Sequence, residues 1–338
     1  MKKTSLRDIA EALGVSKTLV SLVLNGKAEE HRISKEIIDK VNALAKEKGY
    51  EPNQFAKALR TGKSNTIGLI VADIANPFFS RMARSIEDEA NKANYTVIFG
   101  SSDEDPAKAD KLLKVMLDRQ IDGLIVSPTL GGKSNIEFLK KNKIPFVLID
   151  RHFPELKTNY VGVNNFNAAF DAINDLIKRK GSKKIAHITF NKELYHMEQR
   201  MKGYEKALAD NNIPFNESLI KYLSVDHSKD EIFEIIKSMV TSVDAFFFAN
   251  NRIGLQAIEC IQSLGIAIGQ DINIVCFDDL DAFHLLPAEM SVINQPIYEI
   301  GTNALNLLLE QIESKDMPTK EIILPVSHYT LNNKMSLV

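Results

Sequence analysis

Short runs of apolar, often β-branched residues recur along the chain from residue 66 onward, and helical stretches separate them. Such runs are typical of parallel strands covered on both faces, and their spacing is that of βαβ units. Two successive sets predict an α/β fold with two lobes, each a doubly wound parallel sheet, whose strand carboxyl ends line one cleft. The first set is 66–74, 95–102, 123–129, 145–151 and 160–165, and the second is 184–190, 220–225, 244–250, 272–278 and 290–296.

The N-terminal block has helical rather than strand periodicity. An apolar stripe predicts a first amphipathic helix, which Gly14 ends. Ser16 and Ser34 stand where the N-caps of a second and a third helix are expected. Two helices joined by a tight turn and braced by a third make a helix-turn-helix, whose second helix lies in the major groove of DNA. The stripe of the first helix is Leu6, Ile9, Ala10 and Leu13.

Charge supports a polyanionic partner for this block. Residues 1–63 contain 13 Lys and Arg against 8 Asp and Glu, a net +5, whereas the whole chain carries −2. A basic block on an acidic body is expected to meet nucleic acid. A plain three-helix bundle with a solvated face is the alternative. The outward face of the second helix, which would meet base edges and phosphates, is Lys17, Thr18, Ser21, Leu22 and Asn25, and Ser16 and Ser34 lie beside it.

Motifs along the chain occur together, and in this order, in one known family. They are SLRDIAEALGVSKTLVSLVLNG (5–26), KGYEPNQFAKALRTGKSNTIGLIVADIANPFF (48–79), SSDED (101–105), DGLIVSP (122–128), IPFVLIDR (144–151), GYEKAL (203–208), CFDD (276–279) and INQP (293–296). With these motifs the chain resembles the lac repressor (LacI/GalR) family of bacterial transcription regulators over essentially its whole length. The resemblance implies a homodimer on a palindromic double-stranded DNA operator, controlled by a small-molecule effector that is a sugar or sugar derivative.

The resemblance also implies a domain organisation. Residues 1–51 would be the helix-turn-helix domain, and 52–62 a hinge helix and linker. The rest, 63–338, would be a two-lobe core with the fold of periplasmic sugar-binding proteins, serving effector binding and dimerisation. Because the family crosses between lobes more than once, the first lobe is expected to comprise about 63–163 and 294–324. The second would then comprise about 164–293 and 325–338.

The linker contains a short helical pattern that Asn53 can cap. So short a helix is marginal alone in water and is expected to fold against a partner. In the family the matching helix pairs with its dimer mate in the minor groove, where a leucine wedges open a base step, and this resemblance assigns that role to Leu59, with Ala56 on the same face. In the alternative, Leu59 only packs against Phe55 or the core.

Leu22 departs from the family pattern. Most members carry arginine there, which can bind guanine O6 and N7 bidentately, whereas leucine can only touch a thymine methyl or exclude water. Leu19 likewise replaces a common threonine and loses a phosphate contact. The half-site is therefore expected to differ from the usual one, unless Leu22 turns inward to pack on Leu6 and Asn25.

Polar and aromatic residues at the ends of the predicted strands indicate an effector site. Carboxylates, arginines and amides can grip vicinal hydroxyls, while an aromatic ring covers the apolar face of a sugar. By resemblance, Arg200, Asn250 and Asp278 match effector contacts, and Phe79 matches a stacking position. Asn251 replaces the usual aspartate, and a polar network without a ligand is the alternative. The candidate set is Asp73, Asn76, Phe78, Phe79, Ser127, Asp150, Arg151, Arg200, Asn250 and Asp278.

Other classes of protein find little support. P-loop, dinucleotide, nucleophile-elbow and metalloprotease motifs are missing, so we expect no catalytic residue, metal or cofactor. Two cysteines in apolar surroundings, no signal peptide and no membrane-spanning run favour the cytoplasm. The sequence thus predicts a dimeric, effector-controlled repressor and no enzyme. A stand-alone sugar receptor, or an enzyme sharing the two-lobe core, is the alternative.

Overall fold

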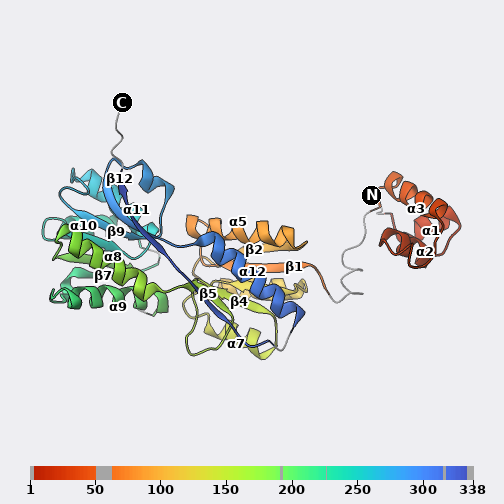
Figure 1. Ribbon diagram of the computed structural model, residues 1–338, viewed down its shortest axis with the longest axis horizontal. Coiled ribbons are helices and arrows are strands. Elements are labelled where there is room, and N and C mark those ends of the chain that lie inside the picture. Colours follow the sequence, from red (N-terminus) through yellow and green to blue (C-terminus); the bar gives the residue numbers. More distant parts are fainter. Residues whose placement is uncertain (1–3, 51–62, 191–192, 226, 315–316, 333–338) are drawn as a thin grey trace. The chain divides into compact units, whose positions relative to one another are not determined.

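The computed structural model describes residues 4–50, 63–190, 193–225, 227–314 and 317–332. The chain divides between Ser64 and Asn65 into two compact units, both drawn in Figure 1. Within the described residues, no helix has both the length and the apolar character needed to cross a membrane. The residues of the predicted hinge helix, Asn53, Ala56 and Leu59, lie outside the described ranges.

The first unit contains the three expected helices, α1 (Leu6–Leu13), α2 (Lys17–Leu24) and α3 (Lys35–Glu47). A capping box between Ser5 and Asp8 starts α1, and Gly14 ends it in a left-handed conformation at φ +64°. The expected apolar stripe packs inward, because Ile9 and Ala10 are buried with the apolar faces of α2 and α3. The sequence therefore builds a small core of its own in this unit.

The second unit contains two six-stranded sheets, one in each lobe, and this confirms the predicted fold class. All ten predicted runs form strands. The first sheet has the order β11 (Glu321–Leu324), β5 (Tyr160–Val163), β4 (Phe146–Ile149), β3 (Gly123–Val126), β1 (Thr66–Val71), β2 (Thr96–Ser101). The second has the order β12 (Ser327–Asn332), β10 (Glu289–Asn294), β9 (Asn273–Phe277), β8 (Ala245–Phe248), β6 (Ile185–Phe190), β7 (Ile220–Leu223).

One strand corrects the expectation of purely parallel sheets. β12 pairs antiparallel with β10, whereas β11, just before it, pairs parallel with β5 in the first lobe. Only two residues separate β11 from β12, so the chain passes from the first sheet to the second without an intervening helix. The chain therefore runs straight from the edge of one sheet to the edge of the other, as the long blue strands in Figure 1 show.

Helices cover both faces of each sheet. Their bounds are α5 (Pro77–Lys92), α6 (Pro106–Asp118), α7 (Lys133–Lys141), α8 (Asn165–Lys180), α9 (Tyr195–Asp210), α10 (Lys229–Met239), α11 (Asn251–Ser263) and α12 (Ile297–Glu313), with short turns η1 (Glu217–Leu219) and η2 (Asp281–Leu285). In the first lobe α5 and α12 share one apolar cluster, and α6 and α7 share another on the opposite face. In the second lobe α8 and α9 oppose α10 and α11.

Two glycines let helices approach closely enough to build these layers. A Cβ at Gly301 of α12 would lie 2.5 Å from Ser85 Oγ of α5, and one at Gly203 of α9 would lie 2.3 Å from the carbonyl oxygen of Phe166 in α8. Neither distance is compatible with a larger side chain unless the helices separate. The α8–α9 contact matters for function, because α9 carries Arg200.

Candidate functional site

The exposed face of α2 is the candidate nucleic-acid interface. Ser16 caps the helix by accepting a hydrogen bond from the Leu19 amide at 3.1 Å. Lys17 and Thr18 are exposed in its first turn, whereas Val20 and Val23 are buried. At its other end Asn25 donates from Nδ2 to the Ser21 carbonyl at 2.6 Å, which holds that amide side chain against the helix. The helix therefore exposes small polar groups and one lysine to solvent, while Val20 and Val23 hold its other face in the core.

Two of the three leucines of α2, Leu19 and Leu22, lie in different environments. Leu19 packs against the core cluster of the first unit, whereas half-buried Leu22 is not among the described residues that do so. Packing in the core thus explains why position 19 is a leucine. Core packing does not explain the leucine at position 22, and Leu22 stays a predicted DNA contact.

Ser34 stands at the N-cap of α3, but the capping hydrogen bond expected from its side chain is absent. The Ile37 amide, which that hydroxyl would have bound, donates instead to the Ser34 carbonyl at 3.0 Å. Ser34 is exposed, so its hydroxyl stays accessible to solvent. A backbone interaction has replaced the predicted cap.

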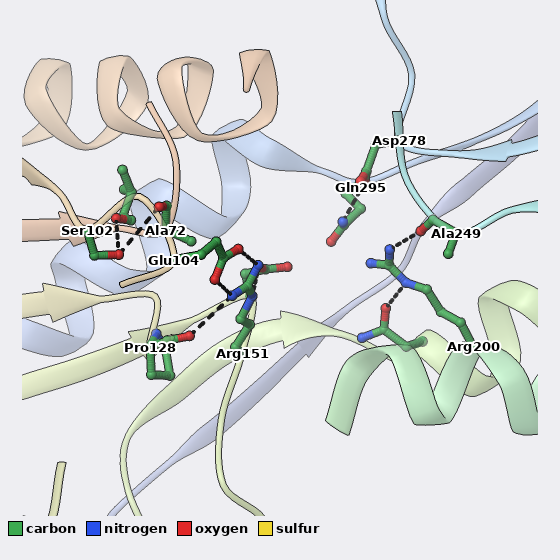
Figure 2. Close-up of polar contacts among 12 residues, drawn as sticks. Ala72, Ser102, Glu104, Pro128, Arg151, Arg200, Ala249, Asp278 and Gln295 are labelled. Atoms are coloured by element: carbon green, nitrogen blue, oxygen red, sulfur yellow. Dashed lines mark hydrogen bonds and ion pairs between the residues drawn. The ribbon is translucent and has the colours of Figure 1, made fainter. Parts of the chain in front are cut away.

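In the second unit, Glu104 and Arg151 form the first half of a charged cluster. Arg151 follows β4, and Glu104 lies in the loop after β2. The two guanidinium Nη atoms donate to the two carboxylate oxygens at 2.6 and 2.7 Å, a bidentate pair drawn in Figure 2. Arg151 Nε also lies 3.4 Å from Asp150 Oδ2. Two carboxylates therefore flank this one guanidinium.

Arg200 and Asp278 form the second half, from the second lobe. Arg200 is 2% exposed and donates from Nε to Asn165 Oδ1 at 2.8 Å and from Nη1 to the Ala249 carbonyl at 2.5 Å. Its Cζ stacks 3.4 Å above the ring centre of Phe277. Asp278, after β9, accepts from Gln295 Nε2 at 2.7 Å. Figure 2 shows this half facing Glu104 and Arg151.

Burial sets the protonation of this cluster. It raises the pKa of Asp150 to about 6, against the opposing effect of Arg151 and Arg200. It also raises the pKa of Asp278, which Arg200 and the Gln295 hydrogen bond partly offset. Burial, together with the nearby guanidinium groups of Arg151 and Arg200, holds the pKa of His196 well below its usual value, so this imidazole is neutral. Both aspartates have left-handed backbones, at φ +62° and +70°, which Asp tolerates better than most residues.

Asn76 and Asn250 take part in helix capping. Asn76 caps α5 by accepting from the Phe78 amide at 3.0 Å, and Asn250 caps α11 by accepting from the Ile253 amide at 2.9 Å. Asn76 Oδ1 also accepts from Asn251 Nδ2 at 3.0 Å, which joins the lobes. An exposed ion pair of 2.7 Å between Arg81 and Asp281 joins them a second time.

The other predicted residues are distributed over three places. Phe78 and Phe79 both belong to the apolar core, and the Phe79 ring centre also lies 5.9 Å from Arg151 Cζ. Ser127 lines a small, mostly apolar cavity inside the first lobe, and its hydroxyl has no partner among the described atoms. Asp73 lines a larger cavity of about 600 Å³ beside the cluster. The structure thus unites Asp150, Arg151, Arg200 and Asp278, with Phe79 beside them. It places Asp73 in the adjoining cavity and sets Phe78 and Ser127 apart.

Three residues of the cluster were missed from the sequence, namely Glu104, Asn165 and Gln295. Each follows a strand, β2, β5 and β10 respectively, so the expectation of polar residues at strand ends, which gave Asp150 and Asp278, also applied to them. Two cavities reach the cluster, the one of about 600 Å³, lined in part by Glu104, and another of about 270 Å³, lined in part by Arg151 and His196. Among the described residues, no group of three or more His, Cys, Asp and Glu could hold a metal ion. Carboxylates and guanidinium groups so arranged can bind hydroxyls by accepting and donating hydrogen bonds.

Comparison with known proteins agrees with this architecture. Residues 5–53 match the bacterial regulatory proteins of the lacI family, and residues 67–327 match a periplasmic binding protein domain. The HTH-type transcriptional regulator RegA of Clostridium acetobutylicum is 33% identical over 92% of this chain and 93% of its own. A LacI family transcriptional regulator from Enterococcus faecium, solved with bound ribose, is 27% identical, with a TM-score of 0.68 over 78% of this chain and 96% of that chain. The lac repressor dimer, solved with operator and the anti-inducer ONPF, shares the fold, with a TM-score of 0.84 at 23% identity over 98% of this chain and 99% of that chain.

Proposed function

The chain belongs to the lacI family of bacterial regulatory proteins, and we propose that it represses transcription by binding a palindromic operator as a homodimer in the cytoplasm. We further propose that a sugar or sugar derivative, bound between the lobes of its core, controls that binding. The match to the family supports the first part, and the charged cluster between the lobes supports the second.

The observation that carries the effector proposal is the facing pair of charged sets. Asp150 and Arg151 come from the first lobe, and Arg200 and Asp278 come from the second. Both aspartates are buried with raised pKa values, which is costly unless a ligand or a partner uses them. The relative solved with ribose supports a sugar as the ligand class. A ligand that touches both sets favours one arrangement of the lobes over another.

Operator recognition is proposed for the exposed face of α2. Lys17, Thr18 and Ser21 would meet phosphates and base edges, and Leu22 would touch a thymine methyl. Residues 52–62 would form the hinge helix, with Leu59 as its minor-groove wedge and Asn53 and Ala56 beside it. The proposed boundaries are 1–51 for the DNA-binding domain and 63–338 for the core. Movement of the lobes would change the position of the hinge helices, and this would couple ligand to DNA reciprocally.

Selection from a random pool of duplexes tests the function directly. The full chain should enrich a palindrome, and sugars added one at a time should change the amount of duplex retained. A Leu22→Arg variant in the same selection should move one symmetric position toward a G·C pair, by about 1–3 kcal/mol. Failure to enrich any duplex, together with binding of a sugar, would favour the stand-alone receptor. Turnover of that sugar would favour the enzyme.

A further inference from the structure

The two arginines of the cleft are already occupied by groups of the protein. The terminal edge of Arg151 is filled by Glu104, at 2.6 and 2.7 Å, and its Nε faces Asp150. Arg200 uses Nε and Nη1 for Asn165 and the Ala249 carbonyl, and its face stacks on Phe277. Phosphates and carboxylates are bound best by a free, bidentate guanidinium edge. The edge of Arg151 that would serve this purpose is blocked from within the protein.

The charge of the cluster also disfavours an anion. Glu104, Asp150 and Asp278 are three carboxylates, and Arg151 and Arg200 are the two guanidinium groups beside them. The Glu104–Arg151 pair is nearly buried, with side-chain exposures of 15% and 10%, so solvent screens it weakly.

The cavity of about 600 Å³ beside the cluster points the same way. Four of the described residues that line it are carboxylates, Asp73, Asp103, Glu104 and Asp105, and one, Arg252, is a cation. Lys108 pairs with Asp103 and Arg151 pairs with Glu104, so Asp73 and Asp105 remain against the one cation Arg252. A cavity lined predominantly by one sign of charge repels ligands of that sign.

From these observations we propose that Glu104 makes this cleft reject phosphorylated and carboxylated sugars, so that the effector is an uncharged sugar or polyol. The inference rests on the proposed function, because it specifies the ligand class of the same site. Glu104 acts here as a specificity residue. It occupies the guanidinium edge that an anionic ligand would need, and leaves Asp150 and Asp278 to accept hydrogen bonds from hydroxyls.

The test measures binding of inorganic phosphate to the full chain by isothermal titration calorimetry. Glu104→Gln keeps a hydrogen-bond acceptor for Arg151 but removes the charge, and it should bind phosphate at least tenfold more tightly than the wild type. The matched control is Glu310→Gln. Glu310 also pairs with a cation of its lobe, Lys320 at 2.5 Å, but it is about half exposed and lies apart from the cavities described here. The control should bind phosphate as weakly as the wild type does.

A second measurement uses the wild type alone and so does not depend on the folding of a variant. Ribose should bind more tightly than ribose 5-phosphate, and glucose more tightly than glucose 6-phosphate. In at least one of these two comparisons the dissociation constants should differ at least tenfold. Tighter binding of either phosphate ester would overturn the inference. So would phosphate binding by Glu104→Gln that equals that of the wild type or of Glu310→Gln.

The two proposals fail in different ways. If a phosphorylated sugar released the wild type from its operator, the charge inference would be wrong and the regulatory function would stand. If Glu104→Gln gained phosphate binding as expected but no sugar altered operator binding, the charge inference would hold. Sugar control of the operator would then be wrong.

Discussion

On the first lobe's side of the cleft, Arg151 is neutralised by Glu104, a carboxylate of its own lobe. On the second lobe's side, the hydrogen-bond partners of Arg200 and Asp278 among the described residues are all uncharged. On the first lobe's side, the charges of Glu104 and Arg151 therefore balance each other. The second side consists of charges whose compensation must come from each other at longer range, from Asp150, or from a ligand. On the proposed function, we expect the second lobe to make the stronger polar contacts with an effector and the first lobe to determine which effectors can bind.

Removing the arginine on each side should give the largest difference. Arg200→Ala removes the guanidinium group that offsets the burial of Asp278 and one of the two beside Asp150, so the free energy of unfolding should fall by roughly 3–5 kcal/mol. Arg151→Ala should lower the free energy of unfolding by less, about 1.5–3 kcal/mol, because the Glu104 carboxylate left behind lines the larger cavity and can be hydrated there. Urea unfolding followed by circular dichroism measures both, which suits a chain without tryptophan. Equal costs would show that the two sides do not differ as described.

Protonation of Asp150 should give the next largest effect. Its pKa is raised from 3.8 to about 6 in the folded chain, so its contribution to stability is fully present below pH 4 and is lost as the pH rises through 6. Asn resembles the protonated form and tolerates a left-handed backbone. Relative to the wild type, Asp150→Asn should therefore gain roughly 2–3 kcal/mol of unfolding free energy between pH 4 and 7.

Urea unfolding at several pH values between 4 and 7 checks that gain. Asp230→Asn is the control, because Asp230 is exposed in the first turn of α10, far along the chain from the cluster. It should follow the wild type at every pH. A parallel pH dependence of Asp150→Asn and the wild type would mean that Asp150 is ionised throughout this range.

The response of operator binding to effector should depend on Asp278 of the second lobe. Asp278→Ala removes an acceptor that a bound hydroxyl would need, and on the proposed function it should raise the effector concentration at half-response by about 5- to 150-fold. Operator affinity without effector should change little. The measurement is an operator-binding titration at increasing concentrations of a sugar that alters wild-type binding, with Asp230→Ala as the control. An unchanged midpoint would remove Asp278 from the site.

The sequence predicted the fold well, because the apolar runs of ten strands are continuous or nearly so. It missed β11 and β12, whose alternating or partial burial resembles an exposed segment rather than a covered strand. Polar residues at predicted strand ends also gave Asp150, Arg151 and Asp278, and the family resemblance gave Arg200, which lies on α9. Neither could say what each side chain would bind. Glu104 and Arg151 are 47 positions apart, and Asn76 and Asn251 are 175 apart, so their pairing depends on the assembled fold and not on local pattern.

The contacts that join the lobes directly should give the smallest effects, and these should differ according to burial. Asn251 is 1% exposed and donates to Asn76, whereas the Arg81 and Asp281 side chains are 40% and 93% exposed. A buried hydrogen bond contributes about 0.5–1.5 kcal/mol, and an exposed ion pair often contributes less than about 0.5 kcal/mol.

Double-mutant cycles to alanine isolate each coupling, and for Asn76 this is essential. Its Oδ1 also caps α5 through the Phe78 amide, so the single variant loses two interactions, but the cycle subtracts the lost cap. We expect a coupling energy of about 1 kcal/mol for Asn76 with Asn251, and one near zero for Arg81 with Asp281. The free energy of urea unfolding of the full chain without effector supplies all the values. A larger coupling for the exposed pair would mean that charge, rather than the buried amide contact, holds the lobes together in this arrangement. The Arg81–Asp281 ion pair would then contribute to the charge balance between the lobes together with the Glu104–Arg151 pair and the Arg200 and Asp278 side chains.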